Sequence, residues 1–185
     1  MARCYSGRVP IRQSPLPILW LVSDARNDAA LERALARLPR GSGLIFRHYH
    51  LEPEARRKRF GKLARLARGR GHRIVLAASA RQARAWGADG AYGSAGTLAG
   101  GPAMLRLVTA HSLAELGHVR RAHADAILLS PVFPTRSHPG AGTLGPARFR
   151  LIARHARLPV IALGGMTLHR ARTLGWKNWA AIDGI

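Results

Sequence analysis

The sequence has little cysteine, few acidic residues and no long apolar run. Its only cysteine is Cys4, so neither a disulfide framework nor a cysteine metal site can be assembled, and we expect a cytoplasmic protein. The opening residues are basic and lack the apolar stretch of a signal peptide. No later run approaches the roughly 18 apolar residues of a membrane-spanning helix. We therefore expect neither a targeting segment nor a membrane segment.

Acidic residues are scarce beside basic ones: 30 Lys and Arg stand against 9 Asp and Glu, for a net charge of +21. Such a charge suggests a nucleic-acid partner. The densest cluster, residues 55–73, is either a phosphate-tracking patch or a solvated helix face with Phe60, Leu63 and Leu66 turned inward. No aromatic platform is interleaved with this charge, which favours the helix face and argues against nucleic acid.

The 185 residues are 47% hydrophobic, enough for one sizeable core. Short apolar runs alternate with amphipathic segments, a pattern typical of βαβ units and a parallel sheet. Residues 94–103 are predicted to form a loop without a helix. The predicted strands are residues 17–23, 43–49, 73–78, 90–93, 105–110, 126–130, 159–165 and 179–184. The predicted helices are residues 27–39, 52–69, 79–87, 111–123, 145–159 and 167–175.

Eight such units in a chain of this length predict an α/β fold, a compact (β/α)8 TIM barrel over residues 16–185. Residues 1–15 form a basic N-terminal extension. The alternative is a doubly wound open sheet, but no G-x-G-x-x-G opens the first helix. No helical pattern follows the eighth strand, so the last helix is expected to be absent, leaving the apolar outer faces of the first and eighth strands exposed.

In such a barrel, the active site lies at the C-terminal ends of the strands. The segment "SPVFPTRSHPGAGTLG" follows the sixth strand and carries Thr135, Arg136, Ser137 and His138. Its prolines restrict the loop, and its glycines let backbone amides approach a ligand. The loop therefore suits an anion, although a surface turn would have a similar composition.

Two further strand ends carry candidate chemistry. In "IALGGMT", Gly164 and Gly165 precede a helix that begins near Thr167, an arrangement that favours a phosphate. In "LVTAHS", Thr109 and His111 end the fifth strand, where a histidine can serve as a general acid or base. The same histidine could instead cap the following helix.

The run "GLIFRHYH" can face the barrel interior in either of two phases. One phase points Ile45, Arg47 and Tyr49 inward, and an inward Arg47 would need an anion such as a ligand phosphate. In the other phase, the alternate residues point inward, and these include His48 and His50. These histidines have the spacing of a metal pair, but no acidic cluster accompanies them, so no metal site is predicted.

Taken together, "VTAHS", "ADAILLSPVFPTRSHPG", "PVIALGGM" and "GADGAYG" resemble the thiamine phosphate synthase family, including its thiazole tautomerase branch. The resemblance runs from about Ile18 to Ile185. It implies a (β/α)8 barrel, a role in thiamine biosynthesis and a small-molecule ligand, either a phosphorylated thiazole or thiamine phosphate. It leaves the oligomeric state open, a homo-oligomer included.

The chain also departs from the family pattern at several positions. Family members that join a pyrimidine pyrophosphate to a thiazole phosphate carry Gln-x-Arg-x-Lys in strand two, of which only Arg47 remains. The family's Asn-Asp after strand three aligns with residues 77–78, which are both alanine, and residues 93–101 hold no carboxylate for the second metal ligand. His138 replaces the lysine of the strand-six loop, beside retained hydroxyls. No cofactor is therefore certain, and Mg²⁺ is implied only if synthase activity is retained.

The phosphate half of the family pattern is better preserved. Gly164 and Gly165 match its phosphate-binding glycines, and Ile182 with Asp183 matches its Ile-Ser pair, although Asp183 adds a negative charge. In the tautomerase branch, the proton-transfer histidine corresponds to His111. The sequence thus favours tautomerase-like proton transfer, with a true thiamine phosphate synthase or a non-catalytic binding barrel as alternatives.

Overall fold

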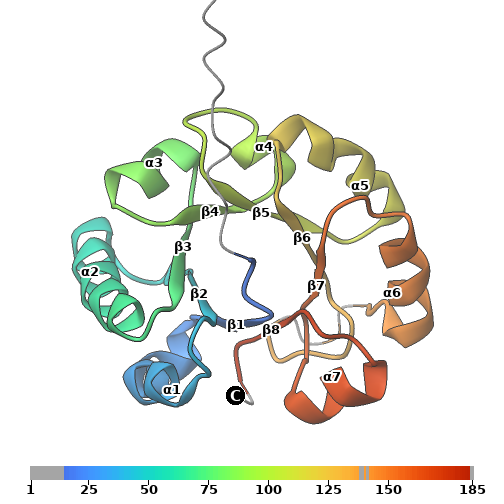
Figure 1. Cartoon of the computed structure of the whole chain (residues 1–185), viewed down its shortest axis with the longest axis horizontal. Coiled ribbons are helices and arrows are strands. Elements are labelled where there is room, and N and C mark those ends of the chain that lie inside the picture. Colours follow the sequence, from blue (N-terminus) through green and yellow to red (C-terminus); the bar gives the residue numbers. More distant parts are fainter. Residues whose placement is uncertain (1–14, 138–139, 141, 184–185) are drawn as a thin grey trace, which may run out of the picture.

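Eight parallel strands close into a barrel in the computed structural model, which describes residues 15–137, 140 and 142–183 (Figure 1). Neighbouring strands pair in sequence order, and the first strand pairs with the last through Trp20 and Ala180. The strands are β1 (Leu19–Val22), β2 (Gly43–Phe46), β3 (Arg73–Ala77), β4 (Gly90–Gly93), β5 (Leu105–Ala110), β6 (Ala126–Leu129), β7 (Val160–Ala162) and β8 (Trp179–Ala181). The predicted (β/α)8 barrel is confirmed, and most of the predicted N-terminal extension lies outside the described residues.

Helices surround the barrel on its outside (Figure 1). They are the 3₁₀ helix η1 (Ala25–Ala30), α1 (Leu31–Arg37), α2 (Pro53–Gly69), α3 (Ala80–Ala85), α4 (Ala95–Leu98), α5 (Leu113–Val119), the 3₁₀ helix η2 (Arg120–Ala122), α6 (Gly145–Arg154) and α7 (Leu168–Leu174). The prediction of a loop without a helix after the fourth strand is wrong, because α4 forms there. There the Ser94 hydroxyl accepts the Thr97 N–H at 3.2 Å, and Leu98 is fully buried, so a cap and one apolar contact support a single turn.

Side chains of the strands form two apolar layers, because alternate residues of a strand face opposite ways. Ile45 belongs to the layer that fills the barrel, whereas Phe46 packs outward with the helices. This settles the phase of β2: Arg47 follows Ile45 on the inward side, at the mouth of the barrel. The inward layer contains Trp20, Val22, Ile45, Val75, Ala77, Tyr92, Leu107, Ala126, Leu128, Ile161, Leu163 and Ala180.

Helix α2 buries one face against the barrel. Phe60 and Leu63 are buried as predicted, but Leu66 is 42% exposed, so its predicted inward position is wrong. Ala64 and Ala67 complete the buried face instead. Residues 60, 63, 64 and 67 follow the i, i+3, i+4, i+7 spacing of one helix face, and position 66 lies off it.

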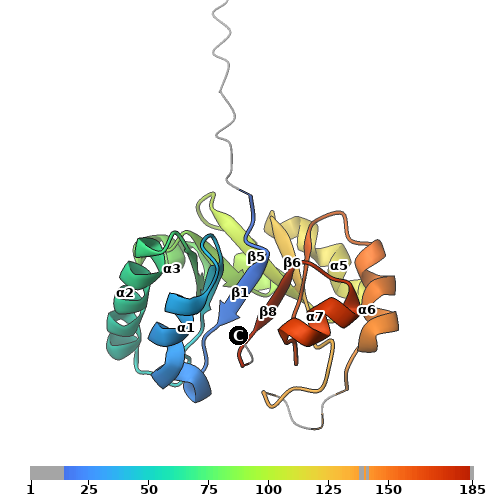
Figure 2. The same ribbon diagram turned by 60° about the horizontal axis from the view of Figure 1, so that its bottom comes forward.

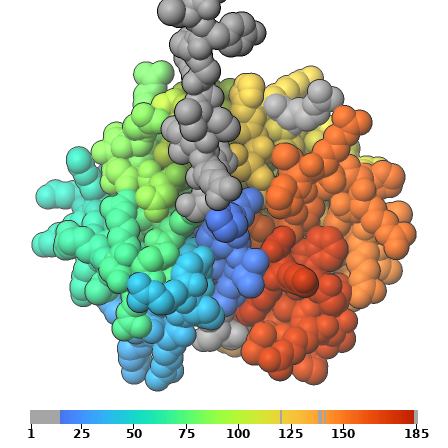
Figure 3. All heavy atoms as spheres, viewed as in Figure 1, coloured from blue at the N-terminus to red at the C-terminus, as the bar shows by residue number. Residues whose placement is uncertain are grey.

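No described helix follows β8, and in Figure 2 β1 and β8 lie in front, between α1 and α7, yet the outer side chains of both strands are buried. Their outward side chains Leu21, Trp179 and Ala181 are 1%, 7% and 2% exposed and belong to the helix-facing core. The expectation that these faces would be exposed is therefore wrong. In Figure 3, the first and last described segments lie side by side on the closed surface, as the pairing of β1 with β8 requires.

Within the described residues, no helix is long and apolar enough to span a membrane.

Candidate functional site

A cavity of about 610 Å³ opens at the C-terminal ends of the strands. Nearly all the residues predicted from strand ends meet there, while His138 lies outside the described residues. The predicted residues that line the cavity are Arg47, Thr109, His111, Thr135, Ser137, Gly164, Gly165, Ile182 and Asp183. Strand ends that are far apart in the sequence thus meet in one concave site.

His111 follows β5 and points its imidazole at the sixth strand's end. Its Nδ1 lies 2.8 Å from the Ser130 carbonyl oxygen, which can only accept a hydrogen bond, so Nδ1 carries the proton. In the neutral ring, Nε2 is then the basic nitrogen. The helix cap belongs to another residue, since the Ser112 hydroxyl accepts the Glu115 N–H at 3.3 Å. The imidazole of His111 is therefore not used in capping.

Arg47 and Tyr49, which follow β2, and Tyr92 of β4 line the cavity. The guanidinium carbon of Arg47 lies 5.7 Å from the centre of the Tyr49 ring. Burial raises the pKa of Tyr92 to about 12, so its hydroxyl is neutral at physiological pH. Sequence reasoning missed Tyr92, although the alternation of "GAYG" was available as a signal for an inward aromatic side chain.

The loop after β6 packs tightly against the turn after β7. The Phe133 N–H donates to the Gly164 carbonyl at 3.1 Å. Gly164 and Gly165 have φ values of +97° and +59°, and a Cβ on Gly164 would lie 2.6 Å from Cα of Pro131. These glycines are thus required by the contact between the two loops as well as by any ligand.

Arg170 is a cavity cation that the sequence analysis missed. It belongs to α7, where its guanidinium donates to the Gly165 carbonyl and lies 4.9 Å from the centre of the Phe133 ring. The backbone N–H of Arg170 donates to the Thr167 hydroxyl at 3.2 Å, which caps the helix. Arg170 therefore joins the turn after β7 to the loop after β6.

Arg26 balances the negative charge of Asp183. Its Nη1 lies 3.7 Å from Oδ2 of Asp183, and its Nη2 donates to the Ser137 hydroxyl at 2.8 Å. Asp24 accepts from Nε of the same guanidinium at 2.8 Å. Arg26 thus connects the loops after β1, β6 and β8. In so arginine-rich a chain, nothing in the sequence singled it out.

The described residues of the cavity lining carry more positive than negative charge: Arg47, Arg136 and Arg170 stand against the single carboxylate of Asp183. Across the described residues, no group of three or more His, Cys, Asp or Glu side chains could hold a metal ion. Both ring nitrogens of His48 are already hydrogen-bonded, at 2.7 Å to Ser23 and at 2.7 Å to Asp28. This lining suits an anionic ligand and does not fit magnesium, which prefers carboxylate oxygens.

Known proteins resemble the chain in both sequence and fold. The family described as thiamine monophosphate synthase matches residues 19–185. A protein of Aquifex aeolicus (strain VF5) named "Putative thiamine-phosphate synthase 2" is 38% identical over 78 residues, 42% of this chain and 41% of that protein. The match to this relative thus spans about two fifths of its length.

Two solved structures share the barrel. Thiamine phosphate pyrophosphorylase from Pyrococcus furiosus superposes with a TM-score of 0.73 at 22% identity, over 90% of this chain and 85% of that one. The enzyme of the same name from Bacteroides thetaiotaomicron gives 0.58 at 14%, over 89% and 82%. At such identities the likeness shows the fold alone. The family match, however, begins in β1 and extends through all eight strands, so the chain belongs to the thiamine monophosphate synthase family.

Proposed function

We propose that this barrel binds a phosphorylated thiazole and moves a proton on it, as a thiazole tautomerase does. The observation that carries the proposal is the placement of His111, whose Nδ1–H is held by the Ser130 carbonyl beside a cavity with three arginines. A neutral imidazole anchored through Nδ1 presents Nε2 as a base, and arginines attract the charged groups of the substrate.

Tautomerisation needs little else. Nε2 of His111 would take a proton from one carbon of the substrate, and the resulting imidazolium would return a proton to another carbon. No bond to a leaving group breaks and nothing is oxidised. Thr135 and Ser137 offer hydroxyls to the ligand from the loop after β6, while the Gly164–Gly165 turn and Arg47 supply further contacts for its anionic groups.

Coupling of two rings makes a different demand on the site. When a pyrophosphate leaves, the charge that develops on it must be neutralised, which enzymes do with metal ions and cations. Among the described residues that line the cavity, Asp183 is the only carboxylate, and Arg26 already lies beside it. We therefore favour proton transfer over coupling, and we derive no step through magnesium.

The decisive variant is His111→Asn. With a carboxythiazole phosphate tautomer as substrate, ¹H NMR should show turnover by the wild-type protein and a loss of about 100-fold or more in the variant. Calorimetric affinity for the product should change little, because the anion contacts remain. His118→Asn, an exposed histidine on α5, is the matched control and should behave as wild type.

The main alternative is a true thiamine phosphate synthase, which the family match favours. Conversion of thiamine phosphate to fluorescent thiochrome would detect coupling from pyrimidine pyrophosphate, thiazole phosphate and Mg²⁺. Turnover above a no-enzyme control would establish the synthase and overturn our preference. Binding of the thiazole phosphate without turnover in either assay would instead indicate a non-catalytic barrel. The single cysteine suits the cytoplasm, where we place either activity.

A further inference from the structure

A chain of hydrogen bonds runs beneath Arg47, from the protein surface to its backbone. The Arg47 N–H donates to the Ser23 hydroxyl oxygen at 2.8 Å. That hydroxyl lies 2.7 Å from Nδ1 of His48, and Nε2 of His48 lies 2.7 Å from a carboxylate oxygen of Asp28. Ser23 and His48 are 0% and 1% exposed, so the bond between them is shielded from water, whereas the Asp28 side chain at the other end is 34% exposed.

The direction of each bond follows from chemistry. Burial by itself raises the pKa of Asp28, but its hydrogen bonds with His48 and Arg59 lower it below its ordinary value. An ionised Asp28 can only accept, so Nε2 of His48 carries a proton. Burial lowers the pKa of His48 and keeps the ring neutral, which leaves Nδ1 to accept from the Ser23 hydroxyl. The oxygen of Ser23 is then free to accept the Arg47 N–H.

His48 has an unusual backbone conformation, which the contacts of its side chain stabilise. Its φ of +35° is uncommon for a residue other than glycine. In this conformation the ring stacks on Phe46, with centroids 4.6 Å apart and planes 8° apart, while both ring nitrogens find partners. Asp28 is in turn held by Arg59 of α2, whose Nε donates to it at 2.7 Å. The ring is thus held through both of its nitrogens and through one stacked face.

Ser23 extends the pairing of β1 with β2 by one step. The Ser23 N–H donates to the Ile45 carbonyl at 2.9 Å, and the next N–H along β2, that of Arg47, bonds to the serine side chain. Arg47 is the first residue after β2, which ends at Phe46. Its backbone is held on both sides, by its N–H bond to Ser23 and by Nε of Arg56, which donates to its carbonyl at 3.0 Å.

We propose that Ser23 and His48 are positioning residues that aim Arg47 into the cavity for an anionic group of the ligand. Neither side chain lines the cavity, so both act through the backbone of Arg47. The inference rests on the proposed function, since it gives Arg47 an anion to bind.

The test uses Ser23→Ala and His48→Asn, with inorganic phosphate as the probe. Asparagine tolerates a positive φ but is too short to reach both Ser23 and Asp28. Each variant should bind phosphate about tenfold more weakly by calorimetry. Hydrogen exchange of the Arg47 amide, followed by NMR, should accelerate by a similar factor. Ser23→Thr keeps the hydroxyl and should retain both properties, and Arg47→Ala measures the loss of affinity when the guanidinium itself is removed.

The matched control is His72→Asn. His72 is also buried, at 3% exposure, and bonds through Nε2 to the Leu35 carbonyl at 3.1 Å, but it precedes β3 at the opposite end of the barrel. Its loss should lower stability without changing phosphate affinity or Arg47 exchange.

Three outcomes would overturn the positioning role: wild-type phosphate affinity in both variants, unchanged Arg47 exchange, or an equal loss of affinity in His72→Asn. A wild-type protein that binds neither phosphate nor the thiazole phosphate would instead contradict the proposed function. The Arg47 exchange rate needs no ligand, so it separates the two failures.

Discussion

At the scale of single residues, the cavity depends on positions where only one side chain fits. Gly165 is such a position, because an added Cβ would contact the Pro134 carbonyl oxygen and come within 3.0 Å of Cβ of Phe133. His111 is constrained in a different way, since one backbone carbonyl sets its tautomer. At both positions, contacts with the loop after β6 decide which side chain or which tautomer is present.

Gly165→Ala tests this reasoning against Gly175→Ala. Both glycines have a positive φ, +59° and +62°, but nothing lies within 4 Å of a Cβ at Gly175. We expect Gly175→Ala to lower the free energy of unfolding by about 1–2 kcal/mol, the cost of the left-handed conformation. Gly165→Ala should lose about 1–3 kcal/mol more through steric overlap, measured by urea denaturation. Equal losses would show that the loop contact is unimportant.

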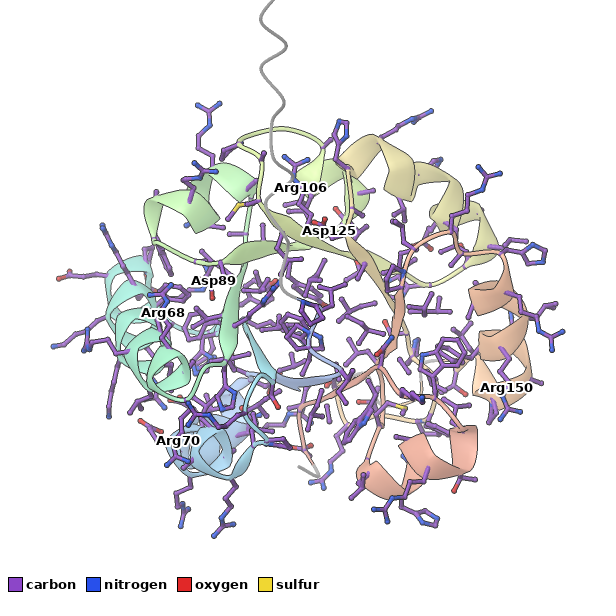
Figure 4. The ribbon with its side chains drawn as sticks, in the orientation of Figure 1. Arg68, Arg70, Asp89, Arg106, Asp125 and Arg150 are labelled. Atoms are coloured by element: carbon purple, nitrogen blue, oxygen red, sulfur yellow. The ribbon has the colours of Figure 1, made fainter. Side chains whose placement is uncertain are left out.

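At the scale of elements, arginines join neighbouring βα units by donating to backbone carbonyls. Arg150 of α6 donates to the Leu174 carbonyl at the end of α7 at 2.6 Å. Buried Arg106 of β5 donates to the Gly101 carbonyl in the segment after α4 at 3.2 Å and to the Ala122 carbonyl at 2.8 Å, while Asp125 accepts its backbone N–H. Figure 4 labels some of the side chains that bond to the backbone, arginines to carbonyls and aspartates to N–H groups: Arg68, Arg70, Asp89, Arg106, Asp125 and Arg150. Part of the high arginine content thus has a structural use.

Helices α1 and α2 are joined by an ion pair whose effect on stability should depend on pH. Hydrogen bonds from Arg59 lower the pKa of Glu32 to about 2. The unfolded chain therefore takes up this proton more readily than the folded protein, so the stabilisation is full above the ordinary glutamate pKa of about 4.3 and is lost as pH falls toward 2. Unfolding measured between pH 6 and 2 should show a shallower loss in Glu32→Gln, which starts less stable. Parallel curves would contradict the pair's contribution.

At the scale of the whole molecule, the net charge of +21 opposes compaction. Salt screens repulsion between exposed charges, with a Debye length of about 10 Å at 0.1 M. Raising NaCl from about 10 mM to about 0.2 M should therefore stabilise the fold by about 1 kcal/mol, a rise in Tm of about 2–4 °C. A neutral osmolyte is the control for non-ionic effects. A flat or falling Tm would mean that the arginines are already compensated by their contacts.

The sequence alone determined the architecture, because eight short apolar runs separated by amphipathic segments have few ways to bury their side chains. It set strand limits less well: the run 159–165 became β7 at Val160–Ala162, since apolar residues extend beyond the paired backbone. Strand ends also predicted where the candidate site residues gather, because parallel strands bring their C-terminal ends to one face of a barrel.

Only the tertiary structure decided which side chains meet. It placed Arg26 beside Asp183 and Ser137, and it brought the Ser23 hydroxyl to the Arg47 N–H. These contacts join residues up to 157 positions apart, counted as 183 − 26. Local patterns fix the periodicity of a strand or helix, whereas the partner of a polar side chain depends on the closure of the whole barrel.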